Sequence, residues 1–318
     1  MRDNNSNSKK TKGNTYKTAN KAFSKPARSS QYKDNAPRKS KEKHTDSKNK
    51  FSISGKPGRS YYQNDFESDR FEADNGAVPG RNAVRELLKS GRAIEKVYVR
   101  EGDREGSITV LVAEILNRGI PLVETDRKKL DELCNYEQHQ GIVAIAAEKE
   151  YVEIEDLLEI AKQKGEKPLI IIADGITDPH NLGAIIRCAE GAGAHGIIIP
   201  KRRAACLTPA VTKASAGALE HLAVVKCSNV ADTVRKLKDA GLWIFAAEAD
   251  GASYLEADFD VACAIVLGSE ENGVSQVVKK NCDYTVSIPM LGKVNSLNVS
   301  TAAAVLLYEA IRKRGINS

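Results

Sequence analysis

The C-terminal half of the chain alternates between short apolar runs and segments in which apolar residues recur at helical spacing. The runs are rich in Ile and Val and are apolar at consecutive rather than alternating positions, which is typical of strands buried on both faces. The expected strands are 168–174, 196–200, 222–227, 243–248, 263–268 and 284–289. The expected helices are 181–191, 209–217, 230–240, 272–280 and 297–314. This alternation predicts an α/β domain with a mostly parallel sheet over residues 167–318.

A smaller α/β domain is predicted ahead of it, over residues 77–148. Folded structure is expected to start near Gly80, with a helix over 80–90 that ends at Gly91. The other expected elements are strands at 96–100, 121–125 and 141–147 and helices at 107–118 and 126–134. A helix within the Glu- and Lys-rich segment 149–166 is expected to link the two domains.

The first sixty residues differ in composition from the rest of the chain. They contain 17 Lys and Arg against four Asp and Glu, a net charge of +13, whereas the whole chain carries +6, so the remainder is mildly acidic. No Leu or Val occurs before Val78. Such a segment buries too little apolar surface to offset the entropy of ordering it, so residues 1–76 are predicted to be a disordered basic tail. Its cations could contact phosphate backbones or could simply keep the chain soluble.

The composition also excludes several classes of protein. No apolar run approaches the ~18 residues that a membrane helix needs, and the N-terminus lacks the apolar core of a secretory signal. We therefore expect a cytoplasmic protein with no membrane partner. The six cysteines lie at least 18 residues apart, which indicates reduced thiols and argues against a metal site or a disulfide framework. They are Cys134, Cys188, Cys206, Cys227, Cys263 and Cys282.

Residues 191–196 match the G-x-G-x-x-G pattern of dinucleotide-binding loops. That fingerprint requires a strand before the glycines and a helix after them, so that the helix N-terminus meets the pyrophosphate. Here the expected helix comes first and the expected strand 196–200 follows. The pattern therefore favours a helix stop and a tight turn over a nucleotide site.

Three loops after expected strands carry more polar groups than a structural role requires. The first, 174–190, contains Asn181 and Arg187. Asn181 could be a helix N-cap, and Arg187 could form a surface pair with Glu190 three residues later. Arg187 is harder to explain structurally, because its short helix starts at the edge where parallel sheets bind ligands.

The second loop contains Glu270 and Glu271, directly after the strand 263–268. These carboxylates suit ligand binding or proton handling, although one of them is also expected to cap the helix 272–280. In the third loop, three polar residues compete for one N-cap position. They are Ser296, Asn298 and Ser300.

Together the three loops resemble the signature motifs of the SpoU/TrmH family of RNA ribose 2′-O-methyltransferases. The motifs are N-x5-R from Asn181, G-S-E-x2-G-V-S from Gly268 and I-P-M-x-G-x3-S-L-N-V-S from Ile288, in family order. The resemblance covers about 168–314. Residues 77–148 look like the small RNA-binding domain of the branch that methylates a guanosine of 23S rRNA, whereas the first seventy-odd residues match no family pattern.

The resemblance implies a SPOUT fold with a C-terminal trefoil knot, S-adenosylmethionine as cofactor, no metal and a homodimer. It implies catalytic roles for Arg187, Asn181, Glu270, Ser296 and Asn298. It implies cofactor contacts at Gly268, Ile288, Leu297, Leu267 and Met290, although the apolar members could be ordinary core residues. In the small domain, candidate RNA contacts are Arg81, Asn82 and Arg85, which could equally be a solvated helix end.

The reaction expected from the resemblance is methyl transfer to a ribose 2′-hydroxyl, most specifically in 23S rRNA during rRNA processing. Because a guanidinium stays protonated above pH ~12, Arg187 suits stabilisation of a developing alkoxide better than proton removal. Glu270 or the adjacent phosphate could then accept the proton. A tRNA or different rRNA methyltransferase, and a non-catalytic RNA-binding assembly factor, are the alternatives.

Overall fold

The computed structural model describes residues 76–102 and 106–315. Apart from Gly76, the predicted tail lies outside these residues. Two α/β domains follow one another along the described chain, and helix α4 (Ile154–Lys164) lies between them in sequence.

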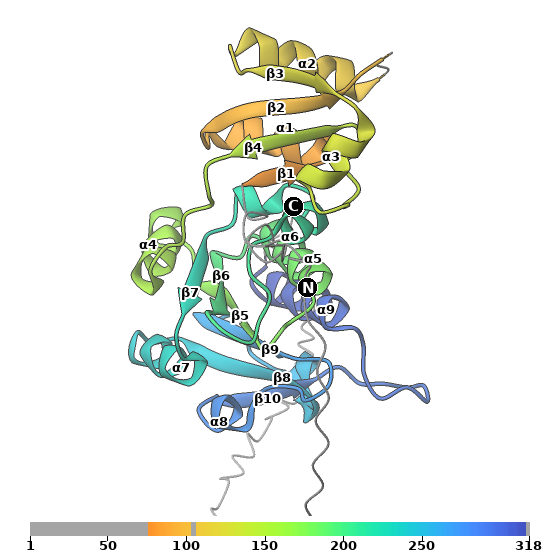
Figure 1. Cartoon of the computed structure of the whole chain (residues 1–318). Helices are drawn as coiled ribbons and strands as arrows, with labels where there is room; N and C mark the ends of the chain where they lie inside the picture. The colour runs from red at the N-terminus through yellow and green to blue at the C-terminus, as the bar shows by residue number, and fades with distance from the viewer. Residues whose placement is uncertain (1–75, 103–105, 316–318) are drawn as a thin grey trace, which may run out of the picture. The chain divides into compact units, whose positions relative to one another are not determined.

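The first domain has a four-stranded mixed sheet in the order β1-β4-β2-β3 (Figure 1). Strand β4 pairs antiparallel with both β1 and β2, whereas β2 and β3 are parallel. Helices α1 and α2 pack on one face around a core that includes Leu87 and Leu111, and α3 packs Leu130 on the other. The elements are β1 (Ala77–Pro79), α1 (Arg81–Ser90), β2 (Ile94–Arg100), α2 (Ser107–Asn117), β3 (Leu122–Thr125), α3 (Arg127–Leu133) and β4 (Ile142–Ala146).

The expectation that folded structure starts near Gly80 was wrong by one strand. Residues Ala77 to Pro79 form β1 and pair with Val143 to Ile145. Three residues are too few to show a periodicity, and only the pairing with β4 makes them a strand. The first helix does begin after Gly80 and end at Gly91, which adopts the left-handed conformation with φ +77°.

The second domain has a six-stranded sheet in the order β10-β8-β9-β5-β6-β7, in which every pairing is parallel. Its strands are β5 (Leu169–Asp174), β6 (Gly196–Pro200), β7 (Val224–Cys227), β8 (Trp243–Ser253), β9 (Cys263–Gly268) and β10 (Tyr284–Ser287). Its helices are α5 (Pro179–Gly191), α6 (Pro209–Ala214), α7 (Val230–Asp239), α8 (Gln276–Lys279) and α9 (Val299–Lys313), with short 3-10 turns at Ala218–Glu220 and Tyr254–Glu256. The predicted parallel sheet is confirmed.

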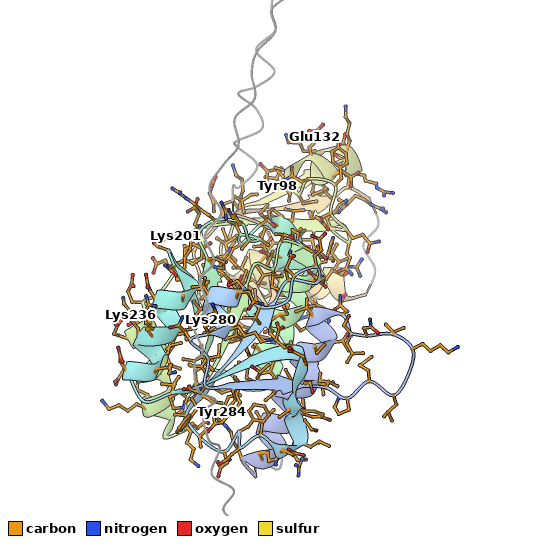
Figure 2. The ribbon with its side chains drawn as sticks, turned by 90° about the horizontal axis from the view of Figure 1, so that it is seen from below. Tyr98, Glu132, Lys201, Lys236, Lys280 and Tyr284 are labelled. Carbon is orange, nitrogen blue, oxygen red and sulfur yellow. The ribbon has the colours of Figure 1, made fainter. Side chains whose placement is uncertain are left out.

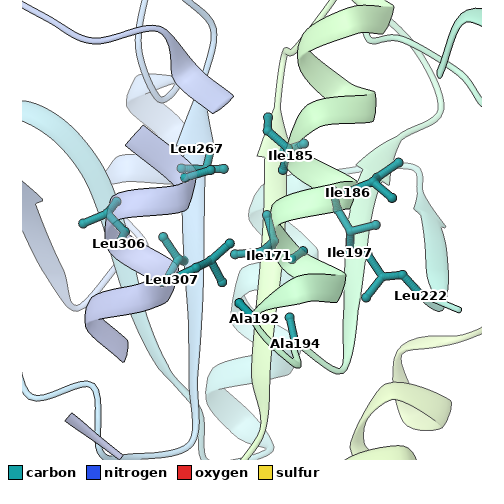
Figure 3. Close-up of a cluster of buried hydrophobic side chains, with 14 of the residues drawn as sticks. Ile171, Ile185, Ile186, Ala192, Ala194, Ile197, Leu222, Leu267, Leu306 and Leu307 are labelled. Carbon is teal, nitrogen blue, oxygen red and sulfur yellow. The ribbon is translucent and has the colours of Figure 1, made fainter. Parts of the chain in front are cut away.

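The sheet is covered on both faces, which explains its continuous apolar runs. Alternate residues of β5 enter different cores: Ile171 packs with α5, α6 and α9, and Ile170 packs with α4, α7 and α8. Figure 3 shows the first core, where Leu306 and Leu307 of α9 lie beside Leu267 of β9. Burial on both faces removes the polar alternate positions that a half-exposed strand would show.

The strand register brings the ends of β5 and β9 to the same level, beside the middle of β8. Asp174 at the end of β5 pairs with Gly268 at the end of β9, and Leu267 pairs with Ala247 within β8. The loops that follow β5 and β9 therefore leave the sheet side by side. This is the edge at which parallel sheets bind ligands.

Several element boundaries differ from those expected. The helix expected at 272–280 is only one turn long, Gln276–Lys279, because the chain first folds back on itself after β9. Strand β8 continues to Ser253, since its second half pairs with β10 across an irregularity at Thr285 and Val286. Strand β10 itself ends at Ser287, so the segment from Ile288 to Asn298 is loop.

The glycine-rich segment 191–196 ends one element and begins the next, as predicted. Helix α5 stops at Gly191, Gly193 adopts φ +67°, and β6 starts at Gly196. His195 is buried in this turn, where its Nδ1 accepts a hydrogen bond from the Leu169 amide at 3.0 Å. In the described ranges no helix is long and apolar enough to span a bilayer.

Candidate active site

A cavity of about 540 Å³ lies at the carboxyl end of β9, beside the middle of β8. Its walls come from residues 247–249 of β8, the end of β9 and the loop after it, the end of β10 and the loop after it, and the first two turns of α9. The loop between β10 and α9 extends away from the rest of the domain (Figures 1 and 2), and Leu291 in this loop is fully exposed. The residues that line the cavity are Ala247, Glu248, Ala249, Leu267, Gly268, Ser269, Glu270, Asn272, Gly273, Val286, Ile288, Met290, Asn295, Ser296, Leu297, Asn298, Val299, Ala302 and Leu306.

Hydrogen bonds join the three predicted loops beside this cavity. The Asn181 amide nitrogen donates to Glu270 Oε1, and Asn181 Oδ1 accepts from Asn298 Nδ2 at 2.9 Å. Asn181 lies on α5, Glu270 follows β9, and Asn298 precedes α9. The two amides and the carboxylate thus form one polar chain across segments up to 117 residues apart.

The N-caps explain why Asn181 is free to make this bridge. The cap of α5 is Asp178, whose side chain accepts from the His180 amide at 2.9 Å, and Pro179 follows at the first helical position. The capping interpretation of Asn181 was therefore wrong. At α9 the cap is Asn298, whose Oδ1 accepts from the amides of Ser300 and Thr301, while its Nδ2 reaches Asn181. One side chain thus serves both the helix and the bridge.

The loop after β9 is a tight reversal that aims Glu270 at the cavity. The Ser269 amide donates to the Gly273 carbonyl and the Gly273 amide donates back to Ser269, at 3.1 and 2.9 Å. A side chain at Gly268 would place its Cβ 2.0 Å from the Gly273 carbonyl carbon, so only glycine fits. Because the reversal delays the helix to Gln276, neither glutamate caps it, and that expectation was wrong.

Glu248, at the end of the apolar run of β8, is a lining residue that the sequence did not single out. Its Oε1 accepts from the Val274 amide at 2.5 Å and its Oε2 accepts from Lys279 at 3.2 Å. Lys279 also donates to Asp250, which raises the pKa of Lys279 and lowers that of Asp250. Glu248 therefore holds the reversal in place as well as facing the cavity. Its position at the end of the expected strand 243–248 was the available signal.

The cavity gathers all the predicted cofactor residues and most of the predicted catalytic ones. Every residue proposed for cofactor contact lines it: Gly268, Ile288, Leu297, Leu267 and Met290. Glu270, Ser296 and Asn298 line it too, and Asn181 is hydrogen-bonded to two of these.

Arg187 is the exception among the predicted catalytic residues. It lies on α5, six residues beyond Asn181 or ~9 Å along a helix axis, and it does not line the cavity. Its side chain is exposed and, within the described ranges, makes no hydrogen bond or ion pair, so the expected pair with Glu190 is absent. An exposed guanidinium without a partner has no structural explanation in the described chain.

The three predicted RNA contacts of the first domain do not act as one group. Arg81 is tied to the loop before β4, where its Nε donates to the Gln140 carbonyl at 3.2 Å. Arg85 instead donates to Asn82 Oδ1 at 3.0 Å on the surface of α1.

Three of the cysteines are unsuited to nucleophilic chemistry. Burial raises the pKa of Cys134 and Cys263 to about 11 and that of Cys282 to about 12, so these thiols stay protonated near neutral pH. Over residues 76–102 and 106–315, no three His, Cys, Asp or Glu side chains gather in a way that could hold a metal ion.

Two family descriptions match the chain, one for each domain. Residues 168–308 match the SpoU rRNA Methylase family, and residues 77–152 match the description RNA 2′-O ribose methyltransferase substrate binding. The chain is 44% identical over 238 residues to YacO of Bacillus subtilis, which is named as a TrmH family tRNA/rRNA methyltransferase; the match covers 74% of this chain and 95% of YacO. A Staphylococcus aureus protein of the same designation is 41% identical over 242 residues, 76% of this chain and 97% of that protein.

Solved structures resemble both domains together. The SpoU methyltransferase AviRb of Streptomyces viridochromogenes, in complex with the cofactor AdoMet, is 27% identical with a TM-score of 0.63 and covers 78% of this chain and 94% of its own. An AdoMet-bound rRNA methyltransferase of Sinorhizobium meliloti is 25% identical with a TM-score of 0.63 and covers 78% and 90% of the two chains.

Proposed function

We infer the reaction of this chain from the premise that it belongs to the SpoU (TrmH) family of S-adenosylmethionine-dependent RNA methyltransferases. We propose that it methylates the 2′-hydroxyl of a guanosine ribose in 23S rRNA and so takes part in rRNA processing. The observation that carries the proposal is the hydrogen-bonded convergence of Glu270, Asn181 and Asn298 at one cavity.

The cavity suits the cofactor in size and chemistry. Its volume of about 540 Å³ is within the usual range for small-molecule sites. Leu267, Ile288 and Leu297 offer apolar surface for a purine ring, and the carboxylates of Glu248 and Glu270 suit a ligand that carries positive charge. When bound, S-adenosylmethionine supplies an activated methyl group, and its transfer to the ribose oxygen breaks the carbon–sulfur bond and leaves S-adenosylhomocysteine.

Glu270 is the residue best placed to manage the hydroxyl proton. Asn181 donates to one of its carboxylate oxygens and is itself held by Asn298, so the carboxylate is fixed in orientation rather than free to rotate. A positioned carboxylate can accept the proton as the ribose oxygen attacks. Ser296, exposed on the loop that completes the cavity, is proposed to contact the ribose or its phosphate.

Arg187 is proposed to act in a homodimer, at the substrate held by a second copy of the chain. Its exposure and lack of a partner in the described ranges support this role, since within one chain it does not line the cavity. There it would stabilise the developing alkoxide and bind the adjacent phosphate as a bidentate donor. The C-terminal trefoil knot of the SPOUT fold is proposed to bring the loops around the cavity together.

The choice of 23S rRNA over tRNA is supported by the separate domain at 77–148, which matches the substrate-binding description and which an rRNA-modifying enzyme would use to find its site. A tRNA or other rRNA target is the alternative, since YacO is named for both tRNA and rRNA. A cytoplasmic location follows if the substrate is ribosomal RNA. The basic tail over 1–76 is proposed to add contacts to RNA phosphates.

The decisive experiment is methyl transfer to unmodified ribosomal RNA and to unmodified tRNA, with mapping of the modified ribose. We expect one methylated guanosine in 23S rRNA. Arg187→Ala should lower the rate by about 10²–10³-fold while S-adenosylmethionine binding, followed by calorimetry, stays unchanged. Arg187→Lys is the matched control that keeps the charge and loses the bidentate geometry. Methylation of tRNA alone, or an Arg187→Ala enzyme of full activity, would contradict the proposal.

A further inference from the structure

A second cavity, of about 400 Å³, lies entirely within the first domain. It is bordered by the start of α1, the end of β2, the start of α3 and the loop that leads into β4. Its lining is polar and includes one exposed aromatic ring. The lining residues are Arg81, Arg100, Ile108, Arg127, Asp131, Tyr136, Glu137, Gln138, His139, Gln140 and Gly141.

Three guanidinium groups from three different elements meet at this cavity. Arg81 is held in place, because its Nε donates to the Gln140 carbonyl and its Nη1 donates to Ser107 Oγ, both at 3.2 Å. Arg100 is exposed and, among the described residues, forms no ion pair. Arg127 is exposed and its only ion pair within those ranges is a long one, 3.6 Å to Asp131. The guanidinium groups of Arg100 and Arg127, which are exposed and have no close ion pair among the described residues, are therefore available to an anionic ligand.

The loop that forms the cavity wall has an unusual backbone. Asn135, Tyr136 and Gln140 have φ of +53°, +63° and +53°, and they make up most of the non-glycine residues with positive φ in the described chain. The left-handed conformation is unfavourable for a bulky side chain such as tyrosine. Such strain persists where the surrounding structure enforces it, and it clusters at ligand-binding sites. Here it presents the Tyr136 ring to solvent, 76% exposed.

A buried histidine holds this loop in place. The Gly141 amide donates to His139 Nδ1 at 3.0 Å, so the ring proton is on Nε2, which donates to Asp131 at 3.1 Å. Cys134 Sγ adds hydrogen bonds to the carbonyls of Leu130 and Glu137. The loop is therefore a preformed wall, and Asp131 is occupied by His139 and is not an unpaired negative charge.

The other carboxylate that lines the cavity is that of Glu137. The Lys213 ammonium is close enough to interact with it: burial lowers the pKa of Lys213, and the Glu137 carboxylate acts in the opposite direction. The three arginines that line the cavity outnumber its two carboxylates, and Asp131 is paired with His139, so the described lining is positively charged.

We propose that this cavity is a binding site for a single-stranded RNA nucleotide, with Arg100 and Arg127 on the phosphate and Tyr136 stacked on the base. The inference rests on the proposed function, because it concerns how the RNA substrate is held away from the methylated ribose. Unpaired bases stacked on aromatic rings beside arginines are the usual basis of single-strand recognition by proteins. The residues Asn82 and Arg85, which hydrogen-bond to each other and do not line the cavity, are not part of the site.

The test compares full-length proteins by anisotropy of a labelled ten-residue oligouridine over a range of salt concentrations. Tyr136→Ala should weaken binding about tenfold, and Tyr136→Phe should restore it, because stacking needs the ring and not the hydroxyl. The double variant Arg100→Ala/Arg127→Ala should lower the slope of log affinity against log salt by about 1.4, at about 0.7 for each phosphate contact. Arg85→Ala is the matched loss of one positive charge on the same domain, and we expect no change in affinity.

Each outcome of this test either supports or overturns the proposed RNA-binding site. Unchanged oligouridine binding by the Tyr136→Ala and double-arginine variants would overturn the site, as would a loss seen equally with Arg85→Ala. Binding of double-stranded RNA with the same arginine dependence and no dependence on Tyr136 would also overturn it. Melting temperature and S-adenosylmethionine affinity should match those of the unsubstituted protein, since these side chains are exposed. A failure of methyl transfer by the unsubstituted protein would refute the proposed function and leave the oligouridine result independent of it.

Discussion

The two cavities described above are built in different ways. The cavity of the second domain is lined by apolar residues such as Leu267 and Ile288 together with polar residues such as Glu270 and Asn298. The cavity of the first domain has charged and amide side chains on almost every side and an exposed ring at Tyr136. An apolar wall excludes water from a small ligand, whereas a charged wall replaces bound water with contacts to a polyanion.

The two cavities also differ in the interactions that hold their walls in place. Around the larger cavity, loops from distant parts of the chain are fixed to each other by hydrogen bonds, such as the one from Asn298 to Asn181. Around the smaller cavity a single loop is fixed internally, by His139 and by strained backbone. A reaction needs groups from several strands held in mutual register, whereas binding one nucleotide needs only one shaped surface.

The largest expected effect is on the reversal that shapes the cavity proposed to bind S-adenosylmethionine. In Gly268→Ala the new methyl would collide with the backbone of Gly273 and Val274, at 2.0 and 2.1 Å, where no side chain can move aside. We expect S-adenosylmethionine affinity to fall about 100-fold and stability to fall by about 4 kcal/mol, measured by calorimetry and urea unfolding.

Gly292→Ala is the control for this substitution, because nothing lies within 4 Å of its position. It should leave stability and cofactor affinity unchanged. If Gly268→Ala behaved like Gly292→Ala, the close approach of the two loop ends would not matter, and the comparison of the two walls would fail.

A medium effect is expected from Asn298, which serves both the helix cap and the inter-loop bridge. Asn298→Ala removes both and should cost about 1 kcal/mol of stability from the cap alone. Asn298→Ser keeps an oxygen that can cap α9 but loses the donor to Asn181. The serine variant should therefore keep its stability in urea yet methylate RNA about tenfold more slowly, as the loss of one hydrogen bond predicts. Full activity in the serine variant would show that the bridge is only structural.

The smallest effect concerns His195, a buried histidine of the second domain. Its Nδ1 accepts a hydrogen bond from a backbone amide, as the Nδ1 of His139 does in the first domain. Burial lowers the pKa of His195 below the ordinary value, so the unfolded chain takes up a proton at a pH where the native protein does not. This group therefore contributes stability above pH ~6.5 that is lost as the pH falls, at most about 1.4 kcal/mol per pH unit. Urea unfolding at pH 7.5 and 5.5 should show the loss, and it should shrink in His195→Asn. Equal pH dependence in both proteins would exclude His195 as the cause.

Local pattern was enough to predict most of the fold. The consecutive apolar residues of 168–174 and 263–268 reflect burial on both faces, a property each strand carries in its own residues. Helix α1 was equally legible, since Gly91 marks its end. Strand β1 and the single turn of α8 were not, because the first exists only through pairing with β4 and the second is shortened by a reversal that precedes it.

The candidate site likewise has features that the sequence predicted and features that only the structure revealed. The amino-acid sequence by itself determined which residues are candidates for the chemistry, because motif residues such as Asn181, Glu270 and Asn298 follow expected strands, where a parallel sheet binds ligands. Only the tertiary structure decided which of them bridge and which cap, that Glu248 joins them, and that Arg187 stays outside the cavity. The same holds for the Tyr136 cavity, whose arginines come from three elements. Burial on both faces of a sheet leaves a mark in the consecutive apolar residues of each strand, whereas a contact across 117 residues depends on strand register, which no local pattern records.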